Sequence, residues 1–312
     1  MSSTRLLRPN GNEEKTDSLL RKTFFGDCGL RSGWRLLLFL LLLVMFEAGL
    51  REAMVQVPLV YRILKAGQNG TISPQYELIF ETALITGMFL SAAIMSKIEK
   101  RSLGEYGLPL RSAFGKLFWQ GVLWGLTFEC LEVLAIYTFG GFSFGNRALS
   151  GWSLPMYALG WGVGFVLVGI AEEFLFRGYV QFTLGQGIGF WPSAICISAL
   201  FGAVHLRNIG EGWAGALSVM LFGIFACFTL RRTGTLWFAV GFHAATDYAE
   251  TFLFSVPDSG TFASGQLLHS IFHGPAWLTG GSIGPEGSLF EFVTLIWAFV
   301  IFAYLHPANA GQ

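Results

Sequence analysis

The sequence has little charge for its length. Lys, Arg, Asp and Glu make up 13% of its 312 residues, about half the share that is usual in soluble domains. Such side chains keep a protein surface dispersed in water, whereas 53% of this chain is hydrophobic, with 31 Phe and 10 Trp. The composition excludes an ordinary soluble protein and indicates one that lies in a membrane.

Neither sign of charge is in excess, and cysteine is scarce. The 20 Lys and Arg balance the 20 Asp and Glu, so a nucleic-acid partner is not expected. The four cysteines are far apart and form no CxxC pair, and three of them lie in apolar runs. Buried thiols are therefore favoured over a disulfide framework or a cysteine metal site.

Long apolar segments take the place of the missing charge. A helix needs about 20 mostly apolar residues to cross roughly 30 Å of hydrocarbon. Eight segments qualify, at residues 33–50, 77–96, 116–139, 155–177, 188–206, 213–230, 235–255 and 288–306. We therefore predict an all-α membrane protein with about eight transmembrane helices, forming a bundle over residues 33–306.

The basic residues predict the orientation of this bundle. If the N-terminus is cytoplasmic, 15 of the 20 Lys and Arg fall on the cytoplasmic side, as the positive-inside rule requires. With an even number of spans, both termini are then cytoplasmic. We expect an integral protein of the cell membrane, in contact with the lipid bilayer.

Two segments outside the spans have distinct compositions. Residues 1–32 are mostly polar and predict a flexible cytoplasmic tail. Residues 256–287 are rich in Gly, Ser and Pro but also contain Phe, Leu and Trp, which favours a packed outer lid over a free tether. His269 and His273 lie four residues apart in this loop, and we interpret their spacing as an amphipathic lid helix rather than a metal site.

Ionisable residues inside the spans are costly, at roughly 2.5–3.5 kcal/mol each near the bilayer centre. Three stretches in the second half of the chain contain them. In the first, Glu173 and Arg177 are four residues apart and share a helix face, while Glu172 points about 100° away. One acid is then neutralised while its neighbour stays available for proton transfer. The alternative for Arg177 is that it extends to the headgroups at the cytoplasmic end of its span.

The second stretch places Phe201 and His205 four residues apart, and the third does the same for His243 and Asp247. Taken singly, each histidine fits a core position or a contact between helices. Taken together with Glu172, they come from three helices and each needs a polar partner in an apolar medium. We therefore expect one shared polar cluster inside the bundle.

Such a cluster has the parts for two kinds of chemistry. A carboxylate and neutral imidazoles can activate water. The same residue types are ligands of a divalent metal such as zinc, so Glu172, His205, His243 and Asp247 are also the candidate metal ligands. The chain contains no HExxH sequence, which excludes the best-known zinc-protease signature.

The three stretches resemble a known family. EExxxR at 172–177, FxxxH at 201–205 and HxxxD at 243–247 are similar to the three motifs of the CPBP (CAAX prenyl protease and bacteriocin-processing) family. These are multi-helix intramembrane proteases, related to the type II CAAX endopeptidases that trim prenylated proteins. The resemblance extends over about residues 80–255.

The resemblance implies a role for each residue of the first two motifs. Glu172 would be the base that activates the attacking water, and His205 would help to hold and deprotonate it. Glu173 and Arg177 would support Glu172. Members of the family are discussed both as metalloproteases and as glutamate-dependent enzymes.

The third motif departs from the family pattern. The resemblance implies that His243 and residue 247 stabilise the oxyanion of the tetrahedral intermediate. CAAX endopeptidases carry Asn at this last position, where the present chain has Asp247. An ionised carboxylate would repel an oxyanion, so Asp247 must be protonated, orient His243 or bind a cation.

Two other functions are open at this stage. A non-catalytic immunity or scaffold protein would use the same polar cluster only for helix packing. A solute pathway would need a continuous polar route, and the first three spans offer only isolated acids such as Glu47, Glu81, Glu129 and Glu132. For a protease, one geometric difficulty remains. Glu172 is expected near the inner end of its span and His205 near the outer end of the next, so a shared site requires a broken or tilted helix, or a shifted boundary.

Overall fold

The computed structural model describes residues 23–26, 29–67, 71–208 and 210–308. Most of the predicted N-terminal tail therefore lies outside the described residues. The described chain is an all-α bundle, as the sequence predicts, and a helix covers the position of each predicted span. These helices are α2 (Ser32–Val55), α4 (Pro74–Glu99), α5 (Lys116–Thr138), α6 (Ser153–Glu172), α8 (Phe190–His205), α9 (Trp213–Thr233), α10 (Trp237–Tyr248) and α12 (Leu289–Leu305).

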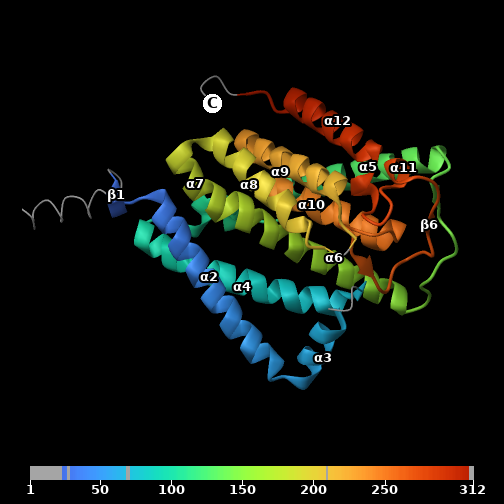
Figure 1. Cartoon of the computed structure of the whole chain (residues 1–312), viewed down its shortest axis with the longest axis horizontal. Helices are drawn as coiled ribbons and strands as arrows, with labels where there is room; N and C mark the ends of the chain where they lie inside the picture. The colour runs from blue at the N-terminus through green and yellow to red at the C-terminus, as the bar shows by residue number, and fades with distance from the viewer. Residues whose placement is uncertain (1–22, 27–28, 68–70, 209, 309–312) are drawn as a thin grey trace, which may run out of the picture.

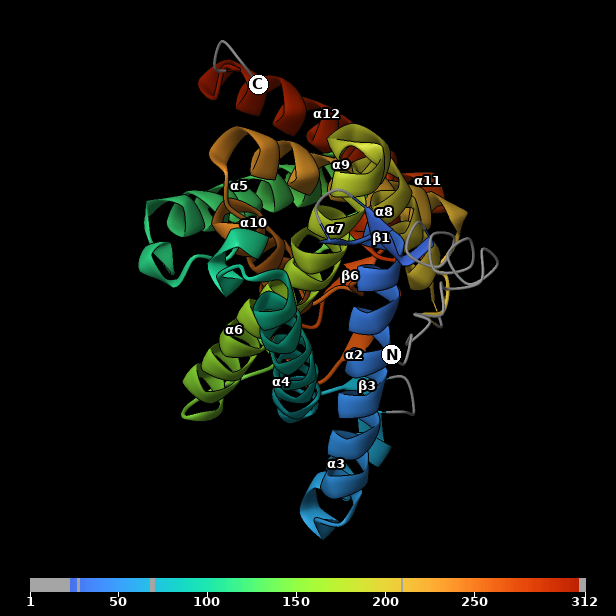
Figure 2. The same ribbon diagram turned by 90° about the vertical axis from the view of Figure 1, so that its left-hand side faces the viewer.

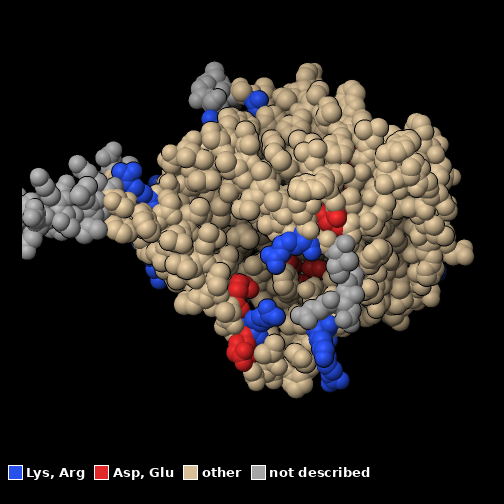
Figure 3. All heavy atoms as spheres, viewed as in Figure 1, with Lys and Arg blue, Asp and Glu red and all other residues tan. Residues whose placement is uncertain are grey.

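By length and composition, five helices can cross a membrane, and α8 and α12 are shorter apolar helices. Large apolar side chains point outward over much of the surface, for example Leu41, Val44 and Ile296. Figure 3 shows one face on which the visible Lys, Arg, Asp and Glu are few. This pattern is that of a bundle solvated by lipid, with its polar side chains turned inward.

Helix α10 lies at the centre of the bundle. Its residues from Trp237 to Ala245 are all buried, and Figure 1 shows it between α5, α6 and α9. Glycines allow this close packing, because a side chain at Gly121 or Gly125 of α5 would collide with the α10 backbone. Small residues at a helix contact let two backbones approach closely in a membrane.

The remaining helices occupy the edges. In both Figure 1 and Figure 2, α12 lies at one edge of the bundle, and α2 lies at the other with the short α3 (Pro58–Gly67). Short 3-10 turns, η1 (Leu103–Tyr106) and η2 (Leu110–Ser112), connect α4 to α5. The edge helices leave α4, α5, α6, α8 and α10 to form the interior.

The span predicted at residues 155–177 corresponds to α6 and the first residues of the π-helical segment η3 (Glu173–Val180). The chain kinks at Gly178, whose φ of −79° and ψ of −106° are not helical, and α7 (Gln181–Ile188) follows beyond the kink. Gly189, with φ +90°, forms the turn into α8.

The helical segment beyond the kink removes the geometric difficulty raised by the sequence. Glu172 lies 16 residues before Ile188, and His205 lies 15 residues after Phe190. Antiparallel segments joined by a tight turn bring such positions to the same depth. The shared site thus involves a broken helix, one of the arrangements that the sequence allowed, with the kink at Gly178.

The loop after α10 folds back onto the bundle. Helix α10 first continues as a π-helical turn, η4 (Ala249–Phe254). The loop then contains β5 (Phe262–Ala263), parallel to β3 (Thr71–Ile72), and β6 (Ile271–Phe272), antiparallel to β4 (Phe142–Ser143). A one-turn helix α11 (Ala276–Thr279) and a 3-10 turn η5 (Pro285–Gly287) follow, and a separate hairpin pairs β1 (Phe25–Gly26) with β2 (Gly29–Leu30).

The helix predicted around His269 and His273 was wrong. This stretch is extended because its backbone pairs with the segment after α5, with His273 N bonded to Gly141 O. The His273 side chain contacts Ser143 at 2.9 Å. A long-range strand pairing has therefore overridden the local i, i+4 spacing.

Candidate active site

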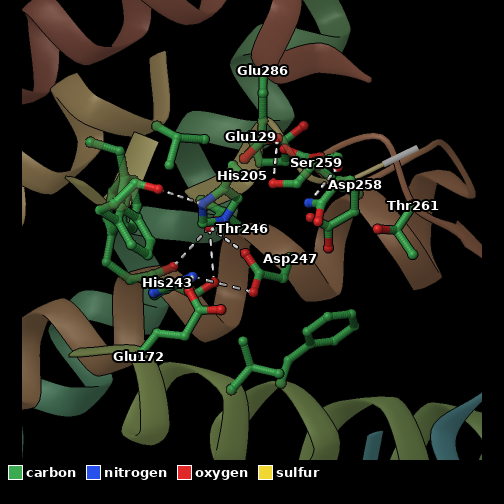
Figure 4. A pocket seen from close by; sticks show the side chains of 18 of the residues that line it. Glu129, Glu172, His205, His243, Thr246, Asp247, Asp258, Ser259, Thr261 and Glu286 are labelled. Atoms are coloured by element: carbon green, nitrogen blue, oxygen red, sulfur yellow. Dashed lines mark hydrogen bonds and ion pairs between the residues drawn. The ribbon is translucent and has the colours of Figure 1, made fainter. Parts of the chain in front are cut away.

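A cavity of about 300 Å³ lies inside the bundle. Its walls come from α4, α5, α6, α8, α9, α10 and α12, with η4, β3 and the loop after α10. Glu172, His205, His243 and Asp247 all line it, so the structure brings the candidate residues of the three motifs together. Figure 3 shows a hollow on the surface with acidic side chains at its depth, and Figure 4 shows these residues directed toward one space.

A buried ion pair forms the floor of the site. Arg177 Nη1 lies 3.2 Å from Glu173 Oε1, and both side chains are completely buried. The Arg177 guanidinium also lies 4.0 Å from the centre of the Phe201 ring. The predicted Glu173–Arg177 contact is thus present, whereas the alternative in which Arg177 extends to the headgroups was wrong. The Arg177 charge instead pairs with the buried Glu173 carboxylate.

The ion pair orients His243. The Nδ1 atom of His243 lies 2.9 Å from Glu173 Oε1. A carboxylate paired with arginine is ionised and can only accept hydrogen bonds, so Nδ1 carries the proton and donates it. The other ring nitrogen, Nε2, therefore faces the cavity in a fixed orientation.

Nε2 of His243 faces two carboxyl groups. It lies 3.6 Å from Glu172 Oε2 and 3.6 Å from Asp247 Oδ2, too far for direct hydrogen bonds. Glu172 Oε2 has no hydrogen-bond partner among the described residues. When the His243 ring is neutral and both carboxyl groups are ionised, Nε2 and the two carboxylate oxygens are all hydrogen-bond acceptors. They therefore need a shared proton or a water molecule that donates to them. The arrangement is suited to holding a water molecule.

In the second motif, the His205 side chain is held by contacts with Phe201. His205 Nδ1 lies 2.8 Å from the Phe201 carbonyl oxygen. Because a carbonyl only accepts, Nδ1 is the donor and Nε2 is left with a lone pair. The two rings also meet edge to face, with centroids 4.6 Å apart. Phe201 thus packs between Arg177 of the first motif and His205, which explains the FxxxH spacing.

The sequence did not identify Thr246, which lines the cavity between the third-motif residues. Its Oγ1 lies 2.9 Å from the His243 carbonyl oxygen and 3.4 Å from Asp247 Oδ1. The hydroxyl therefore ties the Asp247 carboxyl to the backbone of α10. A Thr before a motif residue gives no signal in a single sequence, because threonine is common in helices of this kind.

The cavity is lined mainly by acids. Nine carboxyl groups line it, and no Lys or Arg does so within the described part of the chain. They belong to Glu77, Glu81, Glu129, Glu172, Asp247, Glu250, Asp258, Glu286 and Glu291. The expectation that the acids of the first three spans are isolated was therefore wrong for Glu81 and Glu129.

Most of these acids had a signal in the sequence, and two did not. Glu77 and Glu81 are four residues apart in an apolar helix, a spacing that places both on one face. Asp258 and Glu286 lie in the loop, where an acid is unremarkable until the path of the loop is known. Burial raises the pKa of Asp258 to about 6. It also raises the pKa of Glu286 well above its ordinary value, and the Asp258 charge adds to this effect.

The motif residues do not converge on one metal position. No three of Glu172, His205, His243 and Asp247 have ligand atoms that all lie within 4.8 Å of one another. In the described residues such a group is formed by three other acids, Glu250, Asp258 and Glu286. As arranged, Glu172, His205, His243 and Asp247 therefore do not form a three-ligand site for one ion.

Comparison with known proteins agrees with the motifs. Residues 154–249 match a family model described as type II CAAX prenyl endopeptidase Rce1-like. This segment runs from the start of α6 to the end of α10 and contains all three motifs. No curated protein and no solved structure matches the chain. The chain is thus an integral membrane protein, and its residues 154–249 are similar to the type II CAAX prenyl endopeptidase Rce1-like family, a family of CAAX-protease-type intramembrane endopeptidases.

Proposed function

We propose that this chain hydrolyses a peptide bond of a membrane-associated substrate, with Glu172 as the base that activates water. The observation that carries the proposal is the position of Glu172 Oε2, which lies without a partner 3.6 Å from His243 Nε2 inside the cavity. His243 is itself held by the buried Glu173–Arg177 pair. A base beside a second, rigidly oriented proton-carrying group is the arrangement that general acid–base catalysis requires.

The reaction follows from the atoms present. Glu172 takes one proton from the water while the water oxygen forms a bond to the substrate carbonyl carbon. His205 Nε2, left with a free lone pair, accepts a hydrogen bond from the same water and holds it in line. When the C–N bond breaks, Glu172 returns its proton to the leaving nitrogen, so the base is regenerated in each cycle.

The oxyanion that forms in between needs a donor. His243 donates from Nδ1 to Glu173 and can donate from Nε2 once the ring takes a second proton. The Glu173 carboxylate, 2.9 Å away, stabilises the resulting cation. Donors fixed in advance toward the developing charge are often the largest contribution to catalysis.

A scaffold that uses the cluster only for packing is the alternative from another class. In that case each buried polar group would be expected to find a partner. Glu172 does not follow this rule, since its side chain is 27% exposed to the cavity and Oε2 is unpartnered. An unsatisfied carboxylate is costly for packing but is required of a base.

Substitutions of Asp247 separate its two proposed roles. If the protonated carboxyl donates to the oxyanion, Asp247→Asn keeps a donor and retains activity within about threefold, whereas Asp247→Ala loses about 10²-fold or more. If Asp247 instead binds a cation, the amide is a weak substitute and both variants lose activity alike. Initial cleavage rates of the two purified variants, compared with the wild type, give the answer.

The function is tested by comparing the termini of membrane proteins in cells that make the wild type with those in cells that make Glu172→Gln at equal abundance. We expect new peptide ends only with the wild type, and these ends also identify the substrate and whether it is prenylated. Identical termini in both cells, with any phenotype of the protein intact in the variant, would instead support the scaffold.

A further inference from the structure

A second acidic group lies beside the motif residues. Glu250 follows α10 in η4, Asp258 lies near the start of the loop and Glu286 near its end. Each offers one carboxylate oxygen, and these oxygens all lie within 4.8 Å of one another. The loop after α10 therefore returns to the point where it began and closes this group.

Two buried acids at this place each have one oxygen without a hydrogen-bond partner. Glu250 is 4% exposed and its Oε2 has no partner among the described residues. Glu129 of α5 is 3% exposed, and its Oε1 likewise has no partner among these residues. The Glu129 and Glu250 side chains are in hydrogen-bonding contact with each other, and Figure 4 shows Glu129 and Glu286 among the side chains that line the cavity. Buried carboxylates that face one another without a base are strongly disfavoured unless they bind protons or a cation.

The two loop acids are oriented by hydroxyl groups. Thr251 Oγ1 donates to Asp258 Oδ2 at 3.0 Å, and Ser259 Oγ donates to Glu286 Oε2 at 2.7 Å. Each carboxylate is thereby fixed through one oxygen. Hydrogen bonds of this kind commonly orient the ligands of a metal ion.

We propose that Glu250, Asp258 and Glu286 bind a divalent cation that prefers oxygen ligands, with Ca²⁺ as the best fit. Carboxylates are the usual ligands of such hard cations, and Ca²⁺ binds oxygen at about 2.3–2.6 Å. Three carboxylate oxygens that lie within 4.8 Å of one another can all contact one ion at such distances. The site is separate from Glu172 and His243, which do not belong to it.

A cation here would fasten the loop to the catalytic helix. Glu250 lies seven residues after His243 on the continuation of α10. On the other side, Asn208 donates its amide to the Ser259 carbonyl at 2.9 Å, and Asn208 follows His205 by three residues. The bound ion would therefore hold the wall of the cavity that contains both motif histidines. The inference does not depend on the proposed hydrolysis, because it is tested by binding and stability.

The test is Ca²⁺ titration of the full-length chain in detergent after removal of divalent ions, followed by calorimetry and by thermal unfolding. We expect one Ca²⁺ per chain and a rise in the unfolding temperature of roughly 5 °C at a hundredfold excess over Kd. Glu286→Gln removes one ligand charge and should raise Kd at least about tenfold. Glu81→Gln removes an acid of the same cavity outside the group and should leave Kd unchanged.

Two results would overturn the proposal. One is the absence of stoichiometric Ca²⁺ binding by the folded wild type. The other is an equal loss of affinity in Glu286→Gln and Glu81→Gln, which would mean that the ion responds only to the general acidity of the cavity. If Glu286→Gln does not fold, Asp258→Asn gives the same comparison with Glu81→Gln, and the stoichiometry of the wild type still decides.

Discussion

Glu172→Gln should lower kcat roughly 10³-fold and leave KM nearly unchanged. The amide has the size and most of the hydrogen-bonding capacity of the acid but cannot take a proton from water, and a positioned general base contributes about 10²–10⁴-fold. Substrate binding involves the rest of the cavity, so the loss should appear in the chemical step alone. Single-turnover cleavage of a substrate peptide by the purified variant measures it directly.

The control for this prediction is Glu81→Gln. Glu81 is a buried glutamate that lines the same cavity from α4 but belongs to none of the three motifs. We expect its kcat to stay within a few-fold of the wild type, which separates the loss of a base from a general change in cavity charge. A Glu172→Gln enzyme that cleaves at nearly the wild-type rate would exclude Glu172 as the base. The same result would favour another source of activated water.

The sequence predicted the bundle and much of the site because both depend on local patterns. Apolar runs of span length identify membrane helices whatever their neighbours are. The spacing of four residues places Glu173 beside Arg177, and Phe201 beside His205, on any helix. The contacts that the structure shows within each motif are of this kind.

What the sequence did not predict depends on distant parts of the chain. Helix α6 was expected to end near Arg177 because a charge in a span usually marks the membrane boundary. The charge is instead neutralised by Glu173 inside the bundle, and beyond a kink at Gly178 the chain is helical again as α7, to Ile188. The π-helical segment at this point, with Gly178 in a non-helical conformation, has no simple sequence pattern.

The acidic lining of the cavity also depends on distant parts of the chain. The acids of the cavity come from α4, α5, α6, α10 with its continuation η4, α12 and the loop, and only the packing of these helices brings them together. Asp258 and Glu286 lie 28 residues apart in the sequence, and both look like ordinary loop acids. A single chain contains no local pattern that could pair them, since their proximity is set by where the loop returns.

The second large effect concerns stability rather than rate. Arg177→Met should lower the free energy of unfolding by about 3–5 kcal/mol, because it leaves the fully buried Glu173 carboxylate without its cation. The double variant Glu173→Gln/Arg177→Met removes both charges and should recover most of this loss. Neither variant is expected to be active, since His243 loses the ionised partner that orients it. Chemical unfolding of the detergent-solubilised variants, followed by intrinsic tryptophan fluorescence, gives both values.

A matched control comes from an exposed ion pair with the same four-residue spacing. Arg101 and Glu105 are also four residues apart and in contact, but their side chains are 38% and 48% exposed. Arg101→Met should therefore cost no more than about 1 kcal/mol. If Arg177→Met costs as little as Arg101→Met, Glu173 is not held there as a buried anion, and the orientation of His243 must come from another contact. The other outcome is a large loss of unfolding free energy in Arg177→Met that the double variant restores. It would mean that uncharged residues fill the same space at no greater cost in stability. The ion pair would then be retained for the charge on Glu173, which fixes the proton on His243 Nδ1.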